Sequence, residues 1–313
     1  MQKMSLCLIV LLLNASAWPE SFRLVGWNLQ SDRPNHQEDT SDPQFIKDQI
    51  AIKTGVSLWG LCEVYDQQEF NIYKQAAEQT AGHSLTGEFR SYSYNDGLAI
   101  IFDPQVFEAT GAAFSVPNWD GDRPGLVQPL RWKATNDQFL FVINHLNRSN
   151  SARRQRQAGI LNQWAASLGV PIVVAGDYNM DYEFQPEGPR DAAYDNITQN
   201  GVFVWARPIP LLKTNASDDY RPSVLDFVFV ARQPATWMVQ SRILNREDND
   251  PATALDFDDD NRSTDHRPLD AIISTVDGGG PNTPPSLDIQ AIKQRLEAIE
   301  AEVRALRALI DPH

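Results

Sequence analysis

The stretch Val170-Pro-Ile-Val-Val-Ala-Gly-Asp177-Tyr-Asn179 decides the fold. Its apolar run at 170–175 is followed by a glycine, which is typical of a buried β-strand. Two polar side chains, Asp177 and Asn179, follow where that strand would end. A Gly-Asp-Tyr-Asn sequence is also an acceptable turn with no functional importance. The stretch therefore predicts a buried strand, and its functional meaning depends on what the rest of the chain brings beside it.

Short apolar runs of the same kind recur along the 313-residue chain, of which 42% is hydrophobic and 22% charged. We predict strands at 22–28, 56–64, 97–102, 126–132, 139–145, 170–175, 225–230 and 269–273. Helix-like patterns lie between them at 43–53, 66–81 and 151–168. Many strands with a few interspersed helices indicate an α/β fold, in which the sheets lie inside and the helices outside.

Polar or charged side chains end several of these runs. They are Asn28 in Val25-Gly-Trp-Asn, Glu63 in Leu61-Cys-Glu-Val, His145 in Val142-Ile-Asn-His, and Asp265 with His266 in Ser263-Thr-Asp-His-Arg-Pro. Asp226 differs, because it lies inside the apolar run Val224-Leu-Asp-Phe-Val-Phe. An unpaired carboxylate would be costly to bury there. Asp226 therefore needs a partner, and an imidazole or a metal-site residue is the natural candidate.

In chain order, these six elements resemble the endonuclease/exonuclease/phosphatase superfamily, which includes deoxyribonuclease I, apurinic endonucleases, bacterial sphingomyelinases and inositol polyphosphate phosphatases. The resemblance runs from Phe22 to Ile273. It implies a four-layer α/β sandwich, in which two packed β-sheets are flanked by helices. It also implies that the functional site lies at the strand ends on one edge of the sandwich.

A divalent cation is part of what the resemblance implies. Glu63 looks like the principal metal ligand, with Asn28 and Asp265 close to the metal or to the phosphate that it holds. Hard oxygen ligands of this kind suit Mg²⁺, and also Mn²⁺ or Ca²⁺.

The remaining groups would act on the phosphoester. By resemblance, Asp177 would orient and deprotonate the attacking water, and Asn179 would position water or phosphate. His145 and His266 would contact the scissile phosphate, and Asp226 would orient His266 and stabilise its charged form. In-line attack by water builds negative charge on the phosphate oxygens, so a cation and one or two imidazoliums are needed to offset it.

These implied roles predict a phosphoester hydrolase, with a nuclease or related phosphodiesterase as the first choice. A phosphatase or a sphingomyelinase-like phosphodiesterase of the same fold is an alternative. A catalytically inactive binding protein is another, although such a domain would be expected to lack Glu63, Asp177 or His266. His145 stands where apurinic endonucleases resemble one another in having tyrosine, which argues against abasic-site repair.

Four arginines lie close together in Asn147-Arg-Ser-Asn-Ser-Ala-Arg-Arg-Gln-Arg. Among them, Arg148, Arg153 and Arg154 are candidates for contacts with the phosphates of DNA or RNA. A solvated loop and first turn of a helix is the alternative. The formal charge of −14 and the pI near 4.7 argue against a broad basic surface that coats polyanions.

The first 17 residues have the pattern of a signal peptide. Lys3 precedes a short apolar run at 6–13, and Ala15-Ser-Ala17 supplies the small side chains at a cleavage site. The run is too short to span a bilayer, so we expect cleavage after Ala17, a secreted or periplasmic protein, and no stable membrane span. Cys62 would then be the one remaining cysteine, which excludes an intrachain disulfide.

The expected main domain, residues 18–276, is followed by a Gly/Pro-rich linker at 277–286 and a heptad pattern at 287–313. Apolar side chains recur in steps of three and four between Leu287 and Ile310, as in a coiled coil. Isoleucine at both core positions disfavours dimers, so we predict a homo-oligomer, with a trimer as first choice. A helix folded back on its own domain, or a frayed helix, is the alternative, because about three heptads are marginal.

Overall fold

The computed structural model describes residues 20–30, 41–92, 96–183, 190–215, 222–244 and 264–275. The signal peptide, the linker and the coiled-coil helix predicted from the sequence lie outside these residues. None of the helices within these ranges has the length and apolar character that a membrane crossing requires.

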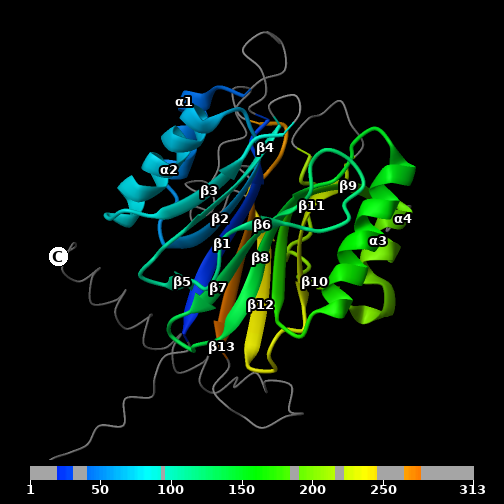
Figure 1. Cartoon of the computed structure of the whole chain (residues 1–313). Helices are drawn as coiled ribbons and strands as arrows, with labels where there is room; N and C mark the ends of the chain where they lie inside the picture. Colours follow the sequence, from blue (N-terminus) through cyan, green and yellow to red (C-terminus); the bar gives the residue numbers. More distant parts are fainter. Residues whose placement is uncertain are drawn as a thin grey trace, which may run out of the picture. The chain divides into compact units, whose positions relative to one another are not determined.

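Two β-sheets form the centre of the fold (Figure 1). The first sheet has the order β12 (Trp237–Ile243), β13 (Leu269–Thr275), β1 (Ser21–Asn28), β2 (Val56–Val64), β4 (Gly97–Phe102) and β3 (Thr86–Arg90). The second has the order β10 (Phe203–Trp205), β11 (Val224–Ala231), β9 (Ile172–Tyr182), β8 (Gln138–His145), β7 (Leu126–Trp132) and β5 (Phe107–Ala109), and β6 (Phe114–Ser115) also pairs with β7.

Helices cover the outer face of each sheet (Figure 1). The outer layers consist of α1 (Pro43–Ala51) and α2 (Gln67–Ala81) on the first sheet, and of α3 (Ser151–Ser167) and α4 (Ala192–Thr198) on the second, where a 3₁₀ turn (Gln199–Gly201) follows α4. Buried side chains of α1 and α2 share an apolar cluster with β1, β2 and β4, and those of α3 and α4 share another with β8, β9 and β11. The predicted four-layer α/β sandwich is therefore confirmed.

Aromatic side chains fill much of the space between the sheets. Phe22 of β1 packs edge-on against Phe107 and Trp132 of the second sheet, and the ring centroids are 4.9 Å apart in both pairs. Large buried rings contribute strongly to core stability. Because Phe22 lies near the start of β1, this packing holds the sheets together at the end of the strand opposite to Asn28.

All eight predicted strands and all three predicted helices are present among the described residues, and three of the strands have the predicted bounds. The strands that the sequence did not reveal are short or lie at sheet edges. In β12, for example, buried and more exposed residues alternate, with Met238 36% exposed. A strand with one solvated face is not a continuous apolar run, and this explains why β12 was missed.

The strand predicted at 170–175 extends further than expected, from Ile172 to Tyr182. The Gly-Asp-Tyr-Asn sequence is thus part of the strand, and its interpretation as a turn is wrong. Gly176 has a φ of 134°, and a Cβ atom there would lie 1.9 Å from the carbonyl oxygen of Asn144 on β8. Only glycine fits this backbone and this close approach.

Strand direction and register bring the predicted site residues to one edge. β1 pairs in parallel with β2, and β8 pairs in parallel with β9, with His145 opposite Asp177. The carboxyl ends of parallel strands meet at the same edge of a sheet. The antiparallel strand β11 adds Asp226 directly opposite Asp177.

Candidate active site

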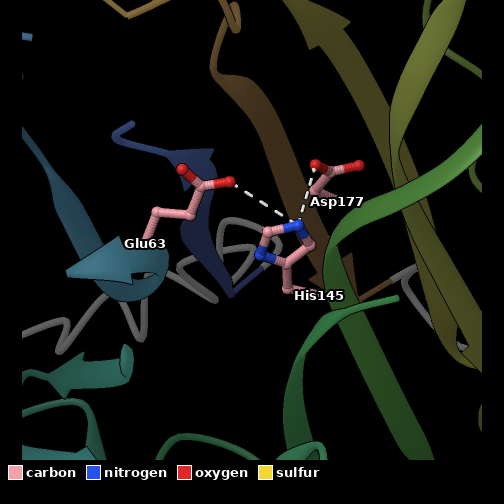
Figure 2. A group of neighbouring side chains, drawn as sticks. All are labelled: Glu63, His145 and Asp177. Atoms are coloured by element: carbon pink, nitrogen blue, oxygen red, sulfur yellow. Dashed lines mark ion pairs between the residues drawn. The ribbon is translucent and has the colours of Figure 1, made fainter. Parts of the chain in front are cut away.

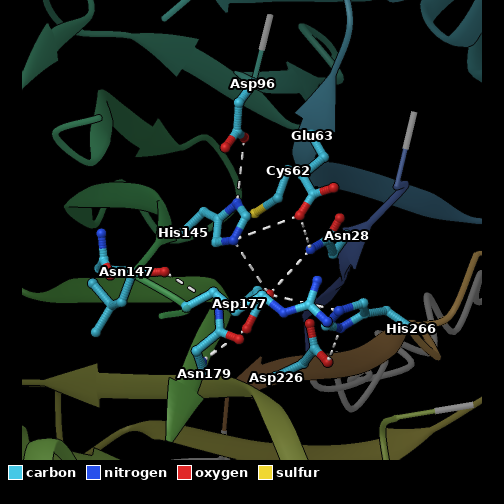
Figure 3. Close-up of polar contacts among 12 residues, drawn as sticks. Asn28, Cys62, Glu63, Asp96, His145, Asn147, Asp177, Asn179, Asp226 and His266 are labelled. Atoms are coloured by element: carbon cyan, nitrogen blue, oxygen red, sulfur yellow. Dashed lines mark hydrogen bonds and ion pairs between the residues drawn. The ribbon is translucent and has the colours of Figure 1, made fainter. Parts of the chain in front are cut away.

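Two carboxylates, Glu63 near the end of β2 and Asp177 in β9, converge on the side chain of Asn28 (Figure 3). The Asn28 amide nitrogen donates to Glu63 Oε1 at 2.9 Å and to Asp177 Oδ2 at 3.1 Å. The Asn28 amide oxygen accepts the backbone N–H of Gln30 at 3.0 Å. In this arrangement Asn28 orients the two carboxylates, and its oxygen is already engaged by the backbone.

The backbone at Glu63 is unusual for a residue with a side chain. Its φ is 54°, and the pairing of β2 with β4 shifts register between Cys62 and Val64. Left-handed backbone at a residue other than glycine costs on the order of 1–3 kcal/mol and clusters at functional sites. The bulge leaves Glu63 half-buried, whereas the side chains on either side of it are buried.

Glu63, His145 and Asp177 form a cluster that could hold a divalent cation (Figure 2). One ligand atom from each lies within 4.8 Å of the others. Two carboxylates at this separation repel each other unless positive charge lies nearby, and carboxylate oxygens are the ligands that hard divalent cations prefer. The donor set therefore fits a hard divalent cation near Glu63.

His266, on the segment that leads into β13, is held by the buried carboxylate of Asp226. The distance from His266 Nδ1 to Asp226 Oδ2 is 2.8 Å, and His266 Nε2 lies 3.6 Å from Asp177 Oδ2 (Figure 3). Burial alone would lower the pKa of His266, but Asp226, Asp177 and Asp265 together raise it well above the ordinary value of 6.5. The expected partner of Asp226 is thus found, and the surrounding carboxylates favour the protonated form of His266.

His145, at the end of β8, lies on the other side of Asp177. Its Nε2 atom is 3.4 Å from Asp177 Oδ2 and 3.6 Å from Glu63 Oε1. Burial, followed by the nearby guanidinium of Arg123, lowers the pKa of His145 to about 4. A pKa of about 4 favours the neutral imidazole of His145 at pH 7, the opposite of the direction at His266.

Asn179 and Asp265 complete the predicted set. Asn179 has a φ of 49°; its backbone N–H donates to Asp177 Oδ1 at 2.8 Å, and its amide nitrogen donates to the carbonyl oxygen of Leu146 at 3.2 Å. Asp265 Oδ1 is 3.6 Å from His266 Nε2. All eight residues predicted as catalytic or metal-binding therefore lie around one site, joined by these contacts.

The three arginines predicted to bind phosphate do not share one location. Arg148 lines the same pocket as Glu63 and Asp177. Arg154 is only 5% exposed, and its guanidinium donates to Asp191 at 2.5 Å and to the carbonyl oxygens of Asn147 and Arg148. Arg154 thus anchors the loop before α3, and a role in phosphate binding does not fit its burial.

Arg153 lies outside the described pocket as well. Its side chain is 40% exposed, and its Nε atom is 3.9 Å from a carboxylate oxygen of Asp120, which also pairs with Arg156 at 2.6 Å. Of the three predicted phosphate-binding arginines, Arg148 alone lines the pocket.

The pocket at this edge has a cavity volume of about 420 Å³. Glu63, Asp177, Asn179, Asp265, His266 and Arg148 are among the residues that line it. Of the predicted catalytic residues, Asp177, Asn179 and His266 line this pocket, so a small substrate group can reach these three from solvent.

Two further residues of the site, Asp96 and Arg123, were not predicted. Arg123 forms an ion pair with Asp96, and its Nε–H donates to the carbonyl oxygen of His145 at 3.0 Å. Asp96 Oδ1 is 3.4 Å from His145 Nδ1, although neither atom makes a hydrogen bond within the described residues. The sequence does offer a signal for Asp96, because it directly precedes the apolar strand β4, but Arg123 belongs to no pattern.

Comparisons by sequence give no relatives: no family model matches the chain, and no curated protein matches it.

Comparison with solved structures identifies the fold. An endonuclease/exonuclease/phosphatase family protein from Bacteroides thetaiotaomicron is 17% identical, with a TM-score of 0.61 over 83% of this chain and 99% of that one. The mannosyl-6-phosphatase of Bacteroides thetaiotaomicron is 16% identical, with a TM-score of 0.58 over 80% and 99%. The D. rerio protein TDP2, in complex with a single-stranded DNA product, is 13% identical, with a TM-score of 0.59 over 82% and 99%. The chain has the fold of the endonuclease/exonuclease/phosphatase family.

Proposed function

We propose that the protein is a divalent-metal-dependent hydrolase of phosphoesters. The observation that carries the proposal is that the carboxylates of Glu63 and Asp177 meet the ion-paired imidazole of His266 within one pocket. Hydrolysis of a phosphoester needs positive charge beside the phosphate oxygens and a base beside the water. His266 supplies positive charge and Asp177 supplies a base, and the two side chains are close enough to act on one phosphoryl group.

Mg²⁺ is the metal that we favour, with Mn²⁺ or Ca²⁺ as alternatives, and Glu63 would be its principal ligand. When bound, it would supply Lewis-acid polarisation of a phosphate oxygen. Asn28 orients both carboxylates through its amide nitrogen. Asp265, which lies beside His266, would contribute to the negative charge that attracts the ion.

The proton transfers fall to groups of the chain itself. Asp177 would accept the proton of the attacking water, and Asn179 holds Asp177 through its backbone N–H. His266 would direct its charged Nε2–H toward the developing negative charge on the phosphate oxygens. Asp226 keeps that proton on His266 by accepting from Nδ1 at 2.8 Å. Proton transfer by such positioned groups contributes about 10²–10⁴-fold to rate.

A nuclease or related phosphodiesterase is one candidate within this class. It is favoured by Arg148, a cation beside the pocket, and the TDP2 neighbour has single-stranded DNA as its product. The support from Arg153 and Arg154 is weaker, because ion pairs with Asp120 and Asp191 engage them.

A phosphatase acting on a small phosphoester is the second candidate. It is favoured by the size of the pocket, about 420 Å³, which suits a single small organic group. One of the structural neighbours is itself a mannosyl-6-phosphatase.

The test compares the full chain with its Glu63→Gln variant on bis-p-nitrophenyl phosphate and p-nitrophenyl phosphate. We expect turnover that EDTA abolishes and Mg²⁺ restores, and a loss of at least about 10²-fold in Glu63→Gln. Glu108→Gln is the matched control, because Glu108 is an exposed glutamate of β5 paired with Arg131. Equal activity of Glu63→Gln and Glu108→Gln would refute the assignment of Glu63, and absence of all turnover would refute the function.

Export and self-association are further proposals that rest on the sequence. A pattern typical of a signal peptide at 1–17 supports a secreted or periplasmic location, and the heptads between Leu287 and Ile310 support a homotrimer. Cell fractionation with N-terminal sequencing tests the first. Sedimentation of the chain with and without residues 287–313 tests the second, and a monomeric full-length chain would overturn it.

A further inference from the structure

One side-chain hydrogen bond joins Asp226 and His266, with His266 Nδ1 lying 2.8 Å from Asp226 Oδ2 (Figure 3). The other carboxylate oxygen, Asp226 Oδ1, is buried and has no hydrogen-bond partner in the described part of the chain. On the other side of the ring, His266 Nε2 lies 3.6 Å from carboxylate oxygens of Asp177 and Asp265, which is too long for a hydrogen bond. The geometry of the pair therefore depends on where the backbone places its two members.

The backbone at Asp226 is irregular. In the pairing of β11 with β9, the register shifts between Val224 and Asp226, and Leu225 between them has no paired residue on β9. Such a shift leaves a backbone N–H without its ladder partner and changes the direction of nearby side chains. The hydroxyl oxygen of Thr214 accepts the N–H of Leu225 at 2.8 Å and that of Asp226 at 3.1 Å. Thr214 thus fixes the backbone that carries the carboxylate.

Thr214 also contacts the segment that carries His266. The carbonyl oxygen of Thr214 accepts the backbone N–H of Arg267 at 2.7 Å, and the next residue, Asn215, forms an isolated antiparallel bridge with His266. Thr214 itself is fully buried. A single residue therefore connects strand β11, which carries Asp226, to the segment that carries His266.

A second buried threonine, Thr264, holds the backbone of His266. Its hydroxyl oxygen accepts the N–H of His266 at 3.0 Å, and its O–H donates to the carbonyl oxygen of Asn28 at 2.9 Å. The carbonyl oxygen of His266 accepts the indole N–H of Trp27 at 2.9 Å. Thr264 therefore ties His266 to Asn28, the residue whose amide bridges the two carboxylates of the site.

From these contacts we infer that Thr214 and Thr264 are positioning residues, whose hydroxyls fix the backbones of Asp226 and His266 and thereby set the hydrogen bond between the two side chains. The expected effect on rate rests on the proposed hydrolysis, whereas the effect on the hydrogen bond does not. Neither threonine lines the pocket, so neither contacts the substrate there. A misplacement of about 1 Å in a group that acts in the transition state can cost about 10²-fold in rate. Hydroxyls that only satisfied buried N–H groups would affect stability alone.

Kinetics of the full chain with Mg²⁺ and bis-p-nitrophenyl phosphate provide the first measurement. Thr214→Val and Thr264→Val each remove the hydroxyl and keep the branched shape of the side chain. We expect kcat to fall by about tenfold to 10²-fold with little change in KM, because alignment acts on the transition state. Thr214→Ser and Thr264→Ser keep the hydroxyl and should keep the kcat of the parent chain. The cysteine variants, whose sulfur is a weaker acceptor, should lie between, so they test the same hydroxyls if the valine variants do not fold.

NMR of the metal-free protein with ¹⁵N-labelled histidine provides the second measurement, which needs no turnover. The hydrogen-bonded Nδ1–H of His266 gives a low-field proton signal, which is assigned by its loss in Asp226→Asn. We expect this signal to shift or broaden in the valine variants and to stay unchanged in the serine variants. His83 is the internal reference, because its Nε2 lies 2.9 Å from Asp103 Oδ1 and its signals should not respond to either threonine.

Thr80→Val is the matched control. The hydroxyl of Thr80 donates to the carbonyl oxygen of Ala51 at 2.5 Å and so joins α2 to the end of α1, and Thr80 does not line the pocket of the site. Its loss should lower the unfolding temperature and leave both kcat and the His266 signal unchanged.

The outcomes separate the inference from the proposed function. Valine variants of Thr214 and Thr264 that behave like Thr80→Val overturn the inference and leave the hydrolase intact. A loss of kcat in the serine variants as large as in the valine variants overturns the role of the hydroxyls. A fall in kcat with an unchanged His266 signal overturns their action through the Asp226–His266 pair. If the parent chain turns over no ester but the valine variants alter the His266 signal, the hydrolase is refuted and the placement of the pair by the two threonines stands.

Discussion

His145 and His266 flank the same carboxylate, Asp177, and are 4% and 7% exposed, yet their imidazoles differ in charge. The pKa of His145 is lowered to about 4, whereas that of His266 is raised well above 6.5. Their distances to Asp177 Oδ2, 3.4 Å and 3.6 Å, are nearly equal. The shared carboxylate therefore does not produce the difference.

The difference comes from the second partner of each ring. His266 Nδ1 makes a hydrogen bond of 2.8 Å with the buried carboxylate of Asp226. His145 Nδ1 lies 3.4 Å from Asp96 without a hydrogen bond, and Arg123 adds a positive charge nearby. Burial favours the neutral form of an imidazole, unless a carboxylate that is hydrogen-bonded to the ring stabilises the charged form. The lesson is that equal burial gives opposite protonation states when the bonded partners differ.

The largest expected effect comes from breaking the stronger of the two pairs. Asp226→Asn keeps the shape of the side chain but removes the charge that holds the proton on His266, and it allows the wrong tautomer. We expect kcat to fall about 10²–10⁴-fold with little change in KM, because the interaction acts on charge that develops in the transition state. Steady-state kinetics on bis-p-nitrophenyl phosphate measures this effect.

Asp137→Asn is the matched control for that change. Asp137 accepts the indole N–H of Trp237 at 2.8 Å. Asp137→Asn therefore also changes a carboxylate that accepts a hydrogen bond from a ring N–H, but that ring is not one of the two imidazoles of the site. Both variants should lower the unfolding temperature, and only Asp226→Asn should lower kcat. A similar loss of kcat in the two would mean that Asp226 acts on stability and not on His266.

A smaller effect is expected from Asp96→Asn, the corresponding change beside His145. Because Asp96 is at 3.4 Å without a hydrogen bond, it orients His145 only weakly, and we expect kcat to fall about tenfold. The same assay measures it. A loss as large as that in Asp226→Asn would contradict the comparison, since it would mean that both rings depend equally on a carboxylate.

The central strands of the fold could be predicted because they are buried on both faces. In β2 and β4 nearly every residue is buried, so each reads as one continuous apolar run, and the predicted bounds are those observed. Edge strand β12 mixes buried and exposed residues and carries Arg242 and Gln240, so its pattern is weaker. Strands can thus be predicted from sequence where nearly all of their residues are buried and therefore apolar.

The site was predictable to the extent that its residues end those strands. Asp226 was detectable as a carboxylate that burial made too costly to leave unpaired, and its partner is His266 as expected. Arg123 reaches the carbonyl oxygen of His145 from a loop 22 residues away, and no local pattern marks that contact. Arg154 was predicted to bind phosphate, but it is buried in an ion pair with Asp191. A cluster of arginines in the sequence does not show which of them is buried.

The smallest expected effect tests whether charge or burial keeps His145 neutral. Arg123→Gln removes the nearby cation and should raise the pKa of His145 above about 4, while leaving it below 6.5, because burial is the larger of the two causes. NMR titration of the imidazole C–H signals in metal-free protein measures both rings together, and His266 should stay protonated well above pH 6.5. Arg131→Gln, which loses only an exposed ion pair with Glu108, should leave both rings unchanged. If His145 in Arg123→Gln instead titrates at the ordinary value of 6.5, the guanidinium and not burial lowers its pKa. The difference between the two histidines would then come from their neighbouring charges alone.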